Sequence, residues 1–291
     1  MLLSSRLVRT ASLALSISLA GAFAPVHAVE PGRHTVEVVA HAGGLAAAPQ
    51  NTVAAVELAI QHGADVIEND VQVTADGRLV VLHNTSLAPT TDVEQVFPDR
   101  SPWNVGDFTL AEIKQLDAGS WFAPEFTGQR VPTLREWARA VGDADMLVEA
   151  KTPELYPGMD RVLARELATR PVFLRALRQG RLTVMSFDHA WLRGFHGLSR
   201  DVPIGLLYAW HATADELMAA ARWADSYVPA ISVVDGRNIS TARLLGMRTY
   251  VWTVNVPTEM QTLVRWRVDG IITDTPAMLR RTLRGSAGRS F

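Results

Sequence analysis

The chain has 291 residues, of which 48% are hydrophobic and 20% are charged, and its formal net charge is −2. This composition is that of an ordinary globular protein with enough apolar material for a full core. The slightly acidic balance argues against a nucleic-acid partner, because such proteins usually need a basic surface to meet the phosphates. The absence of cysteine suits an oxidising compartment without demonstrating one.

The N-terminus has the pattern of a secretory signal peptide over residues 1–28. Arg6 and Arg9 precede an apolar run at residues 11–24, and residues 26–28 match a small-x-small cleavage site. The run is short for a membrane-spanning helix, which needs about 20 residues, although an uncleaved N-terminal anchor is the alternative. Cleavage would remove two arginines and no acidic residue, which moves the net charge from −2 to −4. We therefore expect a periplasmic or secreted protein without a stable membrane span.

From residue 36 onward, short β-branched runs alternate with stretches of helical spacing. The runs predict strands at residues 36–40, 65–74, 146–151, 182–187, 203–208, 227–234, 248–254 and 270–273. Between the first two, residues 51–62 have apolar residues on one helical face, and Gly63 ends the pattern. Strands alternating with helices indicate a parallel sheet. Eight strand candidates in about 240 residues favour an α/β fold, a TIM-type (β/α)₈ barrel over residues 29–291. An open doubly wound sheet is the alternative, although no Gly-rich dinucleotide fingerprint supports it.

One stretch interrupts this alternation. Residues 75–78 contain an Asp-Gly turn signal between the second strand and a further β run at residues 79–83, which predicts a hairpin. Residues 85–130 then show no strand–helix repeat beyond a short helical piece at residues 110–116. We expect a small insertion after strand 2 on the loop side of the barrel, where substrate loops belong. The tail at residues 284–291 is expected to fray.

Ionisable residues stand at the ends of five predicted β runs. They are His41, Glu68 with Asp70, His83, Glu149 with Lys151, and Asp274. Because functional residues of a parallel barrel lie at the C-terminal ends of its strands, these side chains should converge on one mouth. Core packing does not explain them, since burying even one unpaired charge costs several kcal/mol.

The acidic residues among them suggest a metal site. Glu68 and Asp70 are two residues apart, so both carboxylates lie on one face of a strand. Two acids this close repel each other unless a cation lies between them or one is protonated. With Glu149 on the neighbouring strand they would form an oxygen-only site, which suits Mg²⁺ or Ca²⁺ better than Zn²⁺. The alternative is that one or more of these acids pairs with a Lys or Arg at the rim.

The two histidines of this set differ from the others because each one ends an apolar β run. His41 and His83 could share the acid and base roles near neutral pH. Phosphodiester cleavage needs this division, since the leaving alkoxide takes up a proton while the attacking hydroxyl loses one. The charge on the phosphoryl oxygens also needs a metal or a cationic clamp, of which Lys151 could supply part. The sequence does not say which histidine is acid and which is base; our working hypothesis makes His41 the base and His83 the acid.

The ordered motifs resemble the glycerophosphodiester phosphodiesterase family over nearly the whole mature chain. The similar segments are residues 41–44 and 49–52 (H-A-G-G and P-Q-N-T), 63–71 (G-A-D-V-I-E-N-D-V), 80–84 (V-V-L-H-N), 116–122, 131–134, 148–151 (V-E-A-K), 186–187, 252–255 and 270–274. The resemblance implies a TIM-type barrel with a small insertion, a divalent cation (usually Mg²⁺ or Ca²⁺), and release of an alcohol and sn-glycerol 3-phosphate. Carried over residue by residue, it implies an acid–base pair of His41 and His83, metal ligands Glu68, Asp70 and Glu149, a phosphate contact by Lys151, and a pocket wall at Trp252.

Three departures from the family pattern concern the substrate. Ala42 stands where the family usually has Arg, which removes a bidentate phosphate clamp that Lys could replace only as a point charge. Gln50 and Asn84 replace the usual Glu and Asp, and a further Arg is missing at residues 88–91.

Three functions are therefore weighed. The leading one is hydrolysis of glycerophosphodiesters; the second is hydrolysis of lysophospholipids or other phosphodiesters, as in a phospholipase D-like enzyme. The third, from a different class, is a non-catalytic extracytoplasmic binding protein on a degenerate barrel. The first two imply a small-molecule or lipid-derived phosphodiester as partner. The oligomeric state does not follow from the sequence.

Overall fold

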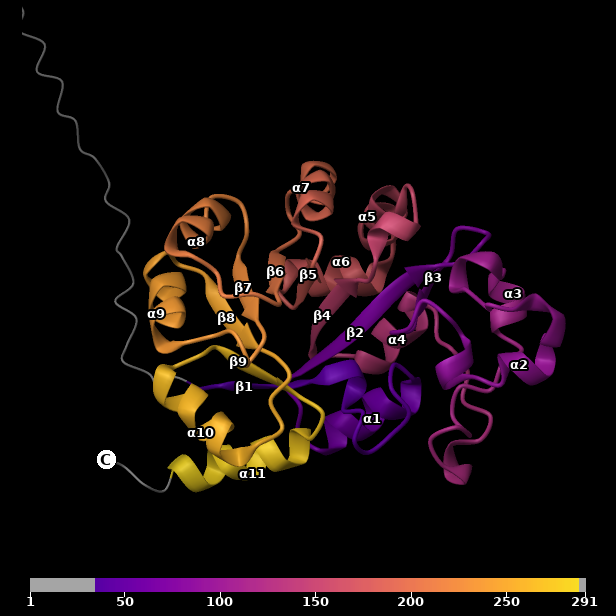
Figure 1. Cartoon of the computed structure of the whole chain (residues 1–291), viewed down its shortest axis with the longest axis horizontal. Coiled ribbons are helices and arrows are strands. Elements are labelled where there is room, and N and C mark those ends of the chain that lie inside the picture. Colours follow the sequence, from indigo (N-terminus) through magenta and orange to yellow (C-terminus); the bar gives the residue numbers. More distant parts are fainter. Residues whose placement is uncertain (1–34, 288–291) are drawn as a thin grey trace, which may run out of the picture. The chain divides into compact units, whose positions relative to one another are not determined.

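Eight parallel strands close into a barrel in the computed structural model of the chain, which describes residues 35–287 (Figure 1). The strands are β1 (Glu37–Ala40), β2 (Val66–Val73), β4 (Asp145–Ala150), β5 (Leu182–Ser186), β6 (Ile204–Tyr208), β7 (Ser226–Pro229), β8 (Arg248–Val251) and β9 (Gly270–Thr273). They follow one another around the barrel in chain order, and β9 pairs with β1 to close it. This confirms the predicted TIM-type barrel. The predicted signal peptide lies outside the described residues.

Helices surround the barrel and connect its strands. They are α1 (Val53–Gln61), α4 (Leu134–Val141), α5 (Met159–Thr169), α6 (Pro171–Arg178), α7 (His189–Leu198), α8 (Ala214–Ala220), α9 (Gly236–Leu244), α10 (Pro257–Trp266) and α11 (Pro276–Ala287). Side-chain caps fix where several of them begin. Thr133 and Thr213, for example, each form a capping box with a glutamate three residues later. Among the helices of residues 35–287, none combines the length and the apolar character that a membrane crossing needs.

The segment after β2 leaves the barrel. The short strand β3 (Leu79–Val81) pairs antiparallel with β2, as predicted for the hairpin. Short helices follow it: η2 (Ala88–Thr90), α2 (Val93–Val96), η3 (Pro98–Arg100), η4 (Val105–Asp107), α3 (Leu110–Ile113) and η5 (Pro124–Phe126). They enclose a small apolar cluster of their own that includes Leu87, Phe108 and Leu116. Two further short helices, η1 (His41–Gly43) and η6 (Pro153–Leu155), follow β1 and β4.

The inside of the barrel is filled by one apolar cluster with a residue from each of the eight strands. Its members are Val39, Val66, Leu147, Met185, Leu207, Val228, Tyr250 and Ile272, with Trp252 packed against them. We call these eight residues the plug. Side chains alternate between the two faces of a strand, so the residue two positions after each plug residue also points inward, toward the C-terminal mouth. The larger apolar cluster lies between the outer face of the sheet and the helices.

Candidate active site

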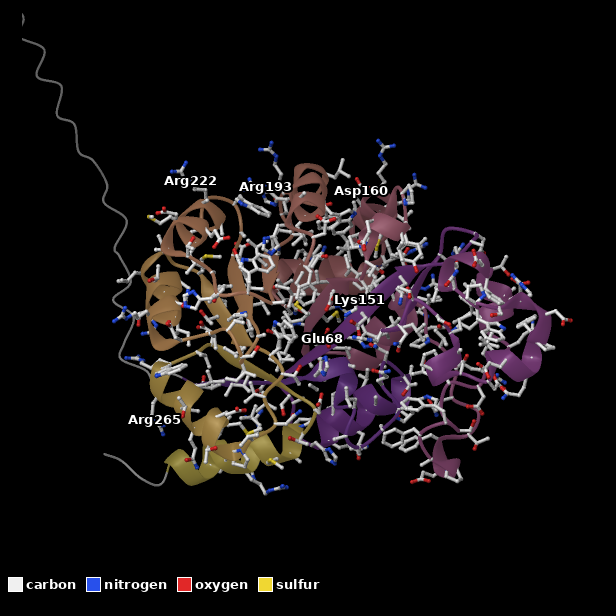
Figure 2. The ribbon with its side chains drawn as sticks, viewed as in Figure 1. Glu68, Lys151, Asp160, Arg193, Arg222 and Arg265 are labelled. Carbon is white, nitrogen blue, oxygen red and sulfur yellow. The ribbon has the colours of Figure 1, made fainter. Side chains whose placement is uncertain are left out.

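The residues two positions beyond the plug form the wall of the mouth. From six strands they are His41, Glu68, Glu149, Phe187, Trp252 and Asp274. The strand period of two therefore explains why chemistry-bearing side chains occur at several strand ends at once. Figure 2 shows Glu68 and Lys151 near each other within the barrel.

A cavity of about 150 Å³ opens at this mouth and has two different sides. Its polar side is formed by His41, Glu68, His83, Glu149 and Lys151. Its apolar side is formed by Met185, Phe187, Leu207, Trp252 and Ile272. The Trp252 indole donates a hydrogen bond to the Val228 carbonyl at 2.9 Å and meets the Phe187 ring edge-on at 5.3 Å, so its orientation is fixed.

Three buried carboxylates gather on the polar side. Glu68, Asp70 and Glu149 each offer an oxygen that lies within 4.8 Å of the others. The backbone N–H of Ala42 donates to Glu68 Oε2 at 2.7 Å, and Asn51 Nδ2 donates to Asp70 Oδ2 at 2.8 Å. Hydrogen bonds from neutral donors orient these carboxylates without cancelling their charge.

Lys151 is the cation that faces this cluster. Its Nζ lies 3.2 Å from Asp70 Oδ1 and 3.1 Å from Glu149 Oε1. The rim pairing that the sequence left open as an alternative therefore occurs for two of the three acids. One ammonium cannot neutralise three carboxylates, so an excess of negative charge remains.

The pKa values indicate that protonation of two of the carboxyl groups reduces this excess of negative charge. Burial, followed by the charge of Asp70, raises the pKa of Glu68 to about 7 and the pKa of Glu149 to about 8. Asp70 is also buried, but the charge of Lys151 and the hydrogen bond from Asn51 hold its pKa below the ordinary value. Two carboxyl groups that keep protons near neutrality, in a set of hard oxygen donors, fit a site for a divalent cation.

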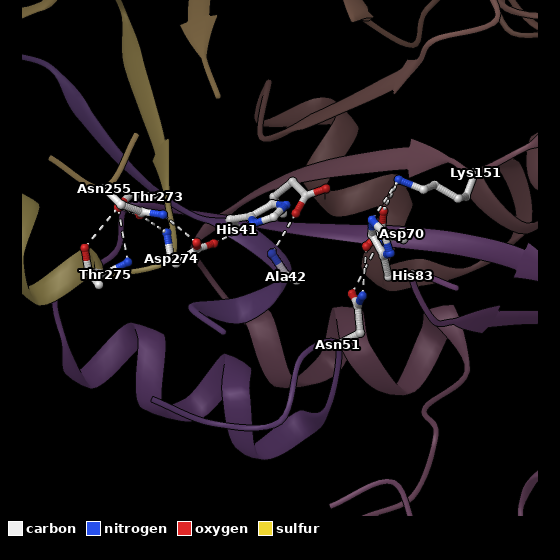
Figure 3. A network of polar contacts seen from close by, with 11 residues as sticks. His41, Ala42, Asn51, Asp70, His83, Lys151, Asn255, Thr273, Asp274 and Thr275 are labelled. Carbon is white, nitrogen blue, oxygen red and sulfur yellow. Dashed lines mark hydrogen bonds and ion pairs between the residues drawn. The ribbon is translucent and has the colours of Figure 1, made fainter. Parts of the chain in front are cut away.

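His41 is held by a partner from the last strand. Its Nδ1 lies 2.6 Å from Asp274 Oδ1, and Asn255 Nδ2 donates to the other oxygen of that carboxylate at 2.5 Å (Figure 3). Burial lowers the pKa of His41, but the hydrogen bond with Asp274 and the charges of Glu68 and Asp70 outweigh it and raise the pKa to about 9. The imidazole is therefore fixed through Nδ1, and its Nε2 remains for the substrate.

His83 has different surroundings beyond the end of β3. Lys151 Nζ lies 3.1 Å from its Nε2 (Figure 3). Because an ammonium group only donates, this ring nitrogen accepts and is unprotonated. Burial lowers the pKa of His83 despite the nearby charge of Asp70. The two histidines thus stand on the same cavity in opposite protonation states at neutral pH.

Comparison with known proteins shows the family to which the chain belongs. The model of the glycerophosphoryl diester phosphodiesterase family matches residues 41–278. The chain belongs to this family. Its enzyme class is that of a phosphoric diester hydrolase. A glycerophosphodiester phosphodiesterase of Caldanaerobacter subterraneus subsp. tengcongensis is 36% identical over 250 residues, which cover 85% of this chain and 97% of that protein. The resemblance seen in the sequence is confirmed.

Solved structures of family members have the same barrel. The glycerophosphodiester phosphodiesterase of Agrobacterium tumefaciens is 27% identical, covers 85% of this chain and 100% of its own, and superimposes with a TM-score of 0.68. A phosphodiesterase of Oleispira antarctica, solved in complex with the product sn-glycerol-3-phosphate, is 24% identical, covers 85% of this chain and 96% of its own, and gives a TM-score of 0.72. At that identity the second comparison supports the fold alone.

The structure brings the seven residues predicted from the sequence to the mouth of this phosphodiesterase barrel. Six of them line the cavity, and the seventh, Asp70, contacts Lys151 at its edge. Asp274 stands at a predicted strand end, but its role beside His41 was not predicted from the sequence. Closure of the barrel between β9 and β1 is the signal that could have paired it with His41. The contact of Asn51 with Asp70 was also not predicted, because it depends on the path of the β1–α1 loop.

Proposed function

We propose that the chain hydrolyses glycerophosphodiesters to an alcohol and sn-glycerol 3-phosphate. The observation that carries this proposal is the placement of two differently charged histidines and three buried carboxylates around one cavity. The family membership and the names of the relatives support the substrate class.

Glu68, Asp70 and Glu149 are proposed to hold a divalent cation, either Mg²⁺ or Ca²⁺. Their close oxygens, their burial and the raised pKa values of the two glutamates support this assignment. When bound, the cation would supply Lewis acidity and neutralise charge on the phosphoryl oxygens. Lys151 would add a fixed ammonium group on the same side of the phosphate.

The contacts support a division of roles opposite to our working hypothesis. His83 has an unprotonated nitrogen, so it would take the proton from the attacking hydroxyl. His41 is charged through its ion pair with Asp274, so it would give a proton to the leaving oxygen. The attacking hydroxyl belongs either to water or to the glycerol of the substrate, and a cyclic phosphate product would identify the second route.

The substrate needs an apolar contact as well as a phosphate site. Trp252 and Phe187 form a fixed aromatic wall opposite the carboxylates. We propose that Trp252 packs against the non-phosphate part of the substrate. Ala42, in place of an arginine, leaves Lys151 as the only Lys or Arg side chain that lines the cavity within the described residues.

The test is release of glycerol 3-phosphate from glycerophosphocholine by the purified protein, after EDTA treatment and addition of Mg²⁺ or Ca²⁺. We expect turnover to return with the metal and to be lost in H41A and H83A. If the protein binds the metal but turns over no phosphodiester, the proposal is wrong. If H83A loses turnover while it still binds the substrate, the binding-protein alternative fails.

A lysophospholipid is the second candidate substrate. The lost arginine at residue 42 and the apolar side of the cavity favour a diester with a larger apolar part. The ratio of kcat/KM for a lysophospholipid to that for glycerophosphocholine separates the two candidates.

We also propose that the enzyme acts outside the cytoplasm, in the periplasm or as a secreted protein. The signal-peptide pattern of residues 1–28 supports this location. Mass spectrometry of the protein from an extracytoplasmic fraction should find a chain that begins after Ala28. An intact N-terminus in that fraction would favour the anchor alternative.

A further inference from the structure

A basic face covers three neighbouring helices, α5, α6 and α7. Residues 159–200, from the start of α5 to the arginine after α7, contain eight arginines and three acidic residues, a net charge of +5 in a chain whose net charge is −2. Six of these arginines are exposed: Arg161, Arg165, Arg175, Arg178, Arg193 and Arg200. Because α5 packs against both α6 and α7, they share one side of the molecule, and Figure 2 shows Arg193 pointing away from the barrel.

The six exposed arginines form no ion pair within the described part of the chain, whereas the other two, Arg170 and Arg181, pair with Glu166 and Asp143. Two of the three acidic residues of the segment are already engaged, since Glu166 pairs with Arg170 at 3.1 Å and Asp188 accepts the Trp191 N–H at 2.8 Å to cap α7. The third, Asp160, lies in the first turn of α5, where a negative charge favours the helix. Arg161 and Arg165 are four residues apart on α5, a spacing at which like charges destabilise a helix. Arg193 lies over the Trp223 ring at 4.4 Å, but none of the six exposed arginines forms an ion pair within residues 35–287, so we look for an anionic partner.

We propose that this basic face binds the surface of an anionic phospholipid membrane. Guanidinium groups bind phosphate oxygens with two parallel hydrogen bonds. Leu198, with 53% of its surface exposed, lies among the arginines of the face and can enter the headgroup region. The choice of a membrane also rests on the proposed function, since removing both acyl chains from a membrane glycerophospholipid leaves a glycerophosphodiester.

Vesicle binding tests the proposal without requiring turnover. Cosedimentation of the full mature chain is compared between vesicles rich in phosphatidylglycerol and vesicles of phosphatidylcholine alone. We expect binding to the anionic vesicles only, and weaker binding as salt increases. The variant R175Q/R178Q should bind about 25-fold more weakly, at about fivefold for each arginine lost near the surface.

The matched control removes the same charge from other helices. R237Q/R265Q changes two exposed arginines on α9 and α10 and should bind like the wild type. Turnover of soluble glycerophosphocholine should be equal in all three proteins, so loss of activity and loss of membrane binding are distinguishable. Equal weakening in the control variant, equal binding to phosphatidylcholine vesicles, or binding to duplex DNA instead of vesicles would overturn the proposal.

A second observation, independent of the first, concerns Gln72 and Tyr156. The fully buried Gln72 donates from Nε2 to the carbonyl of Leu82 at 2.8 Å and to the carbonyl of Asn84 at 2.6 Å. These two carbonyls flank His83. The Tyr156 hydroxyl donates to Gln72 Oε1 at 2.5 Å.

The hydroxyl group decides which way the amide faces. A flipped Gln72 amide would point its oxygen at two carbonyl oxygens, and its NH₂ group at a hydroxyl that now donates to Oε1. Gln72 follows Asp70 by two residues on β2, so both side chains lie on the same face of that strand. The hydrogen bonds therefore link the backbone around His83 to the strand that provides Asp70.

We infer that Gln72 and Tyr156 are a positioning pair that fixes His83 relative to Asp70 and Lys151. Neither side chain is among the residues that line the cavity. They act on the reaction only through the backbone on both sides of His83. An error in the position of a proton-transferring group lowers the rate of the chemical step more than it weakens substrate binding.

Steady-state kinetics on the metal-loaded enzyme test this inference. Y156F and Q72M should each lower kcat about tenfold with little change in KM, and the double variant should be no slower than Q72M, because the hydroxyl acts through the amide. Y227F is the control, since the buried Tyr227 hydroxyl has no hydrogen-bond partner within residues 35–287. A wild-type kcat in Y156F, fully additive losses, or an equal loss in Y227F would refute the pair.

Discussion

Replacing Asp274 by asparagine tests the electrostatics of the His41 ion pair. The D274N side chain keeps the shape and one hydrogen-bonding oxygen but loses the charge 2.6 Å from His41 Nδ1. Both side chains are mostly buried, at 24% and 20% exposure, so solvent screens the pair only in part. The variant should therefore lower the pKa of His41 and destabilise the fold at low pH.

The magnitude follows from the pKa of His41, which is raised from 6.5 to about 9. One pH unit of difference between the folded and unfolded pKa is worth about 1.4 kcal/mol, so all the surroundings of His41 together add at most ~3.5 kcal/mol to the free energy of unfolding. Asp274 makes the largest contribution that raises this pKa, and a nearby opposite charge accounts for about 1–2 kcal/mol. Because the folded pKa is the higher one, this stabilisation is complete below pH 6.5 and is lost as the pH rises through about 9.

Urea unfolding in EDTA at pH 6 and at pH 10 measures this effect on protein charges alone. D274N should be less stable than the wild type at both pH values, and by about 1–2 kcal/mol more at pH 6 than at pH 10. The destabilisation that remains at pH 10 comes from Asn255 Nδ2, which loses its carboxylate acceptor. The control is D235N, which removes the charge from the exposed pair of His211 and Asp235 at 3.4 Å while asparagine still caps α9. Its effect should stay below about 0.5 kcal/mol at both pH values. A destabilisation of D274N that is equal at pH 6 and pH 10 would refute the reasoning.

Three further predictions concern the cation, the lysine and the packing of two glycines. Glu68 and Glu149, with pKa values of about 7 and 8, hold protons that a cation must displace, so the affinity for Mg²⁺ or Ca²⁺ should rise with pH. Calorimetry in buffers of different ionisation enthalpy measures the protons released on binding. If metal binds without proton release, the two glutamates are not the metal ligands. K151M should lower kcat/KM at least about tenfold, while calorimetry should still detect metal binding. Unchanged kinetics would show that Lys151 does not contact the phosphate. G119A should lower the free energy of unfolding by more than about 2 kcal/mol, because a Cβ at this residue would lie 1.9 Å from the Phe126 backbone oxygen. G197A should raise the thermal midpoint slightly, because Gly197 lies in α7 with open space around the new Cβ. A G197A variant that is less stable than G119A would contradict the described packing.

The parts of the site that the sequence predicted are those that depend on strand periodicity. Glu68 and Asp70 are two residues apart on one strand, and Glu149 is on the strand paired with it, so the alternation of side chains and the order of strands bring all three together. His41 and His83 were found because each follows an apolar run. The barrel itself followed from the count and spacing of such runs.

The parts that the sequence did not predict depend on closure and on side-chain conformation. Asp274 is 233 residues away from His41 along the chain, and only the pairing of the last strand with the first brings them together. Lys151 could have pointed toward solvent, and the rotamer that places it against His83 is decided by packing with Phe187 and by the charge of Asp70. The contacts of Gln72 require a hairpin register that an Asp-Gly turn signal does not specify.

The plug has a consequence for how this enzyme can change over time. Its eight apolar side chains are contributed equally by the strands and lie directly below the mouth. Charged groups of the site therefore lie two positions beyond the residues that fill the barrel, although Met185, Leu207 and Ile272 of the plug also line the cavity. Lineages could exchange mouth residues, and so acquire new substrates, while the barrel continues to fold as before.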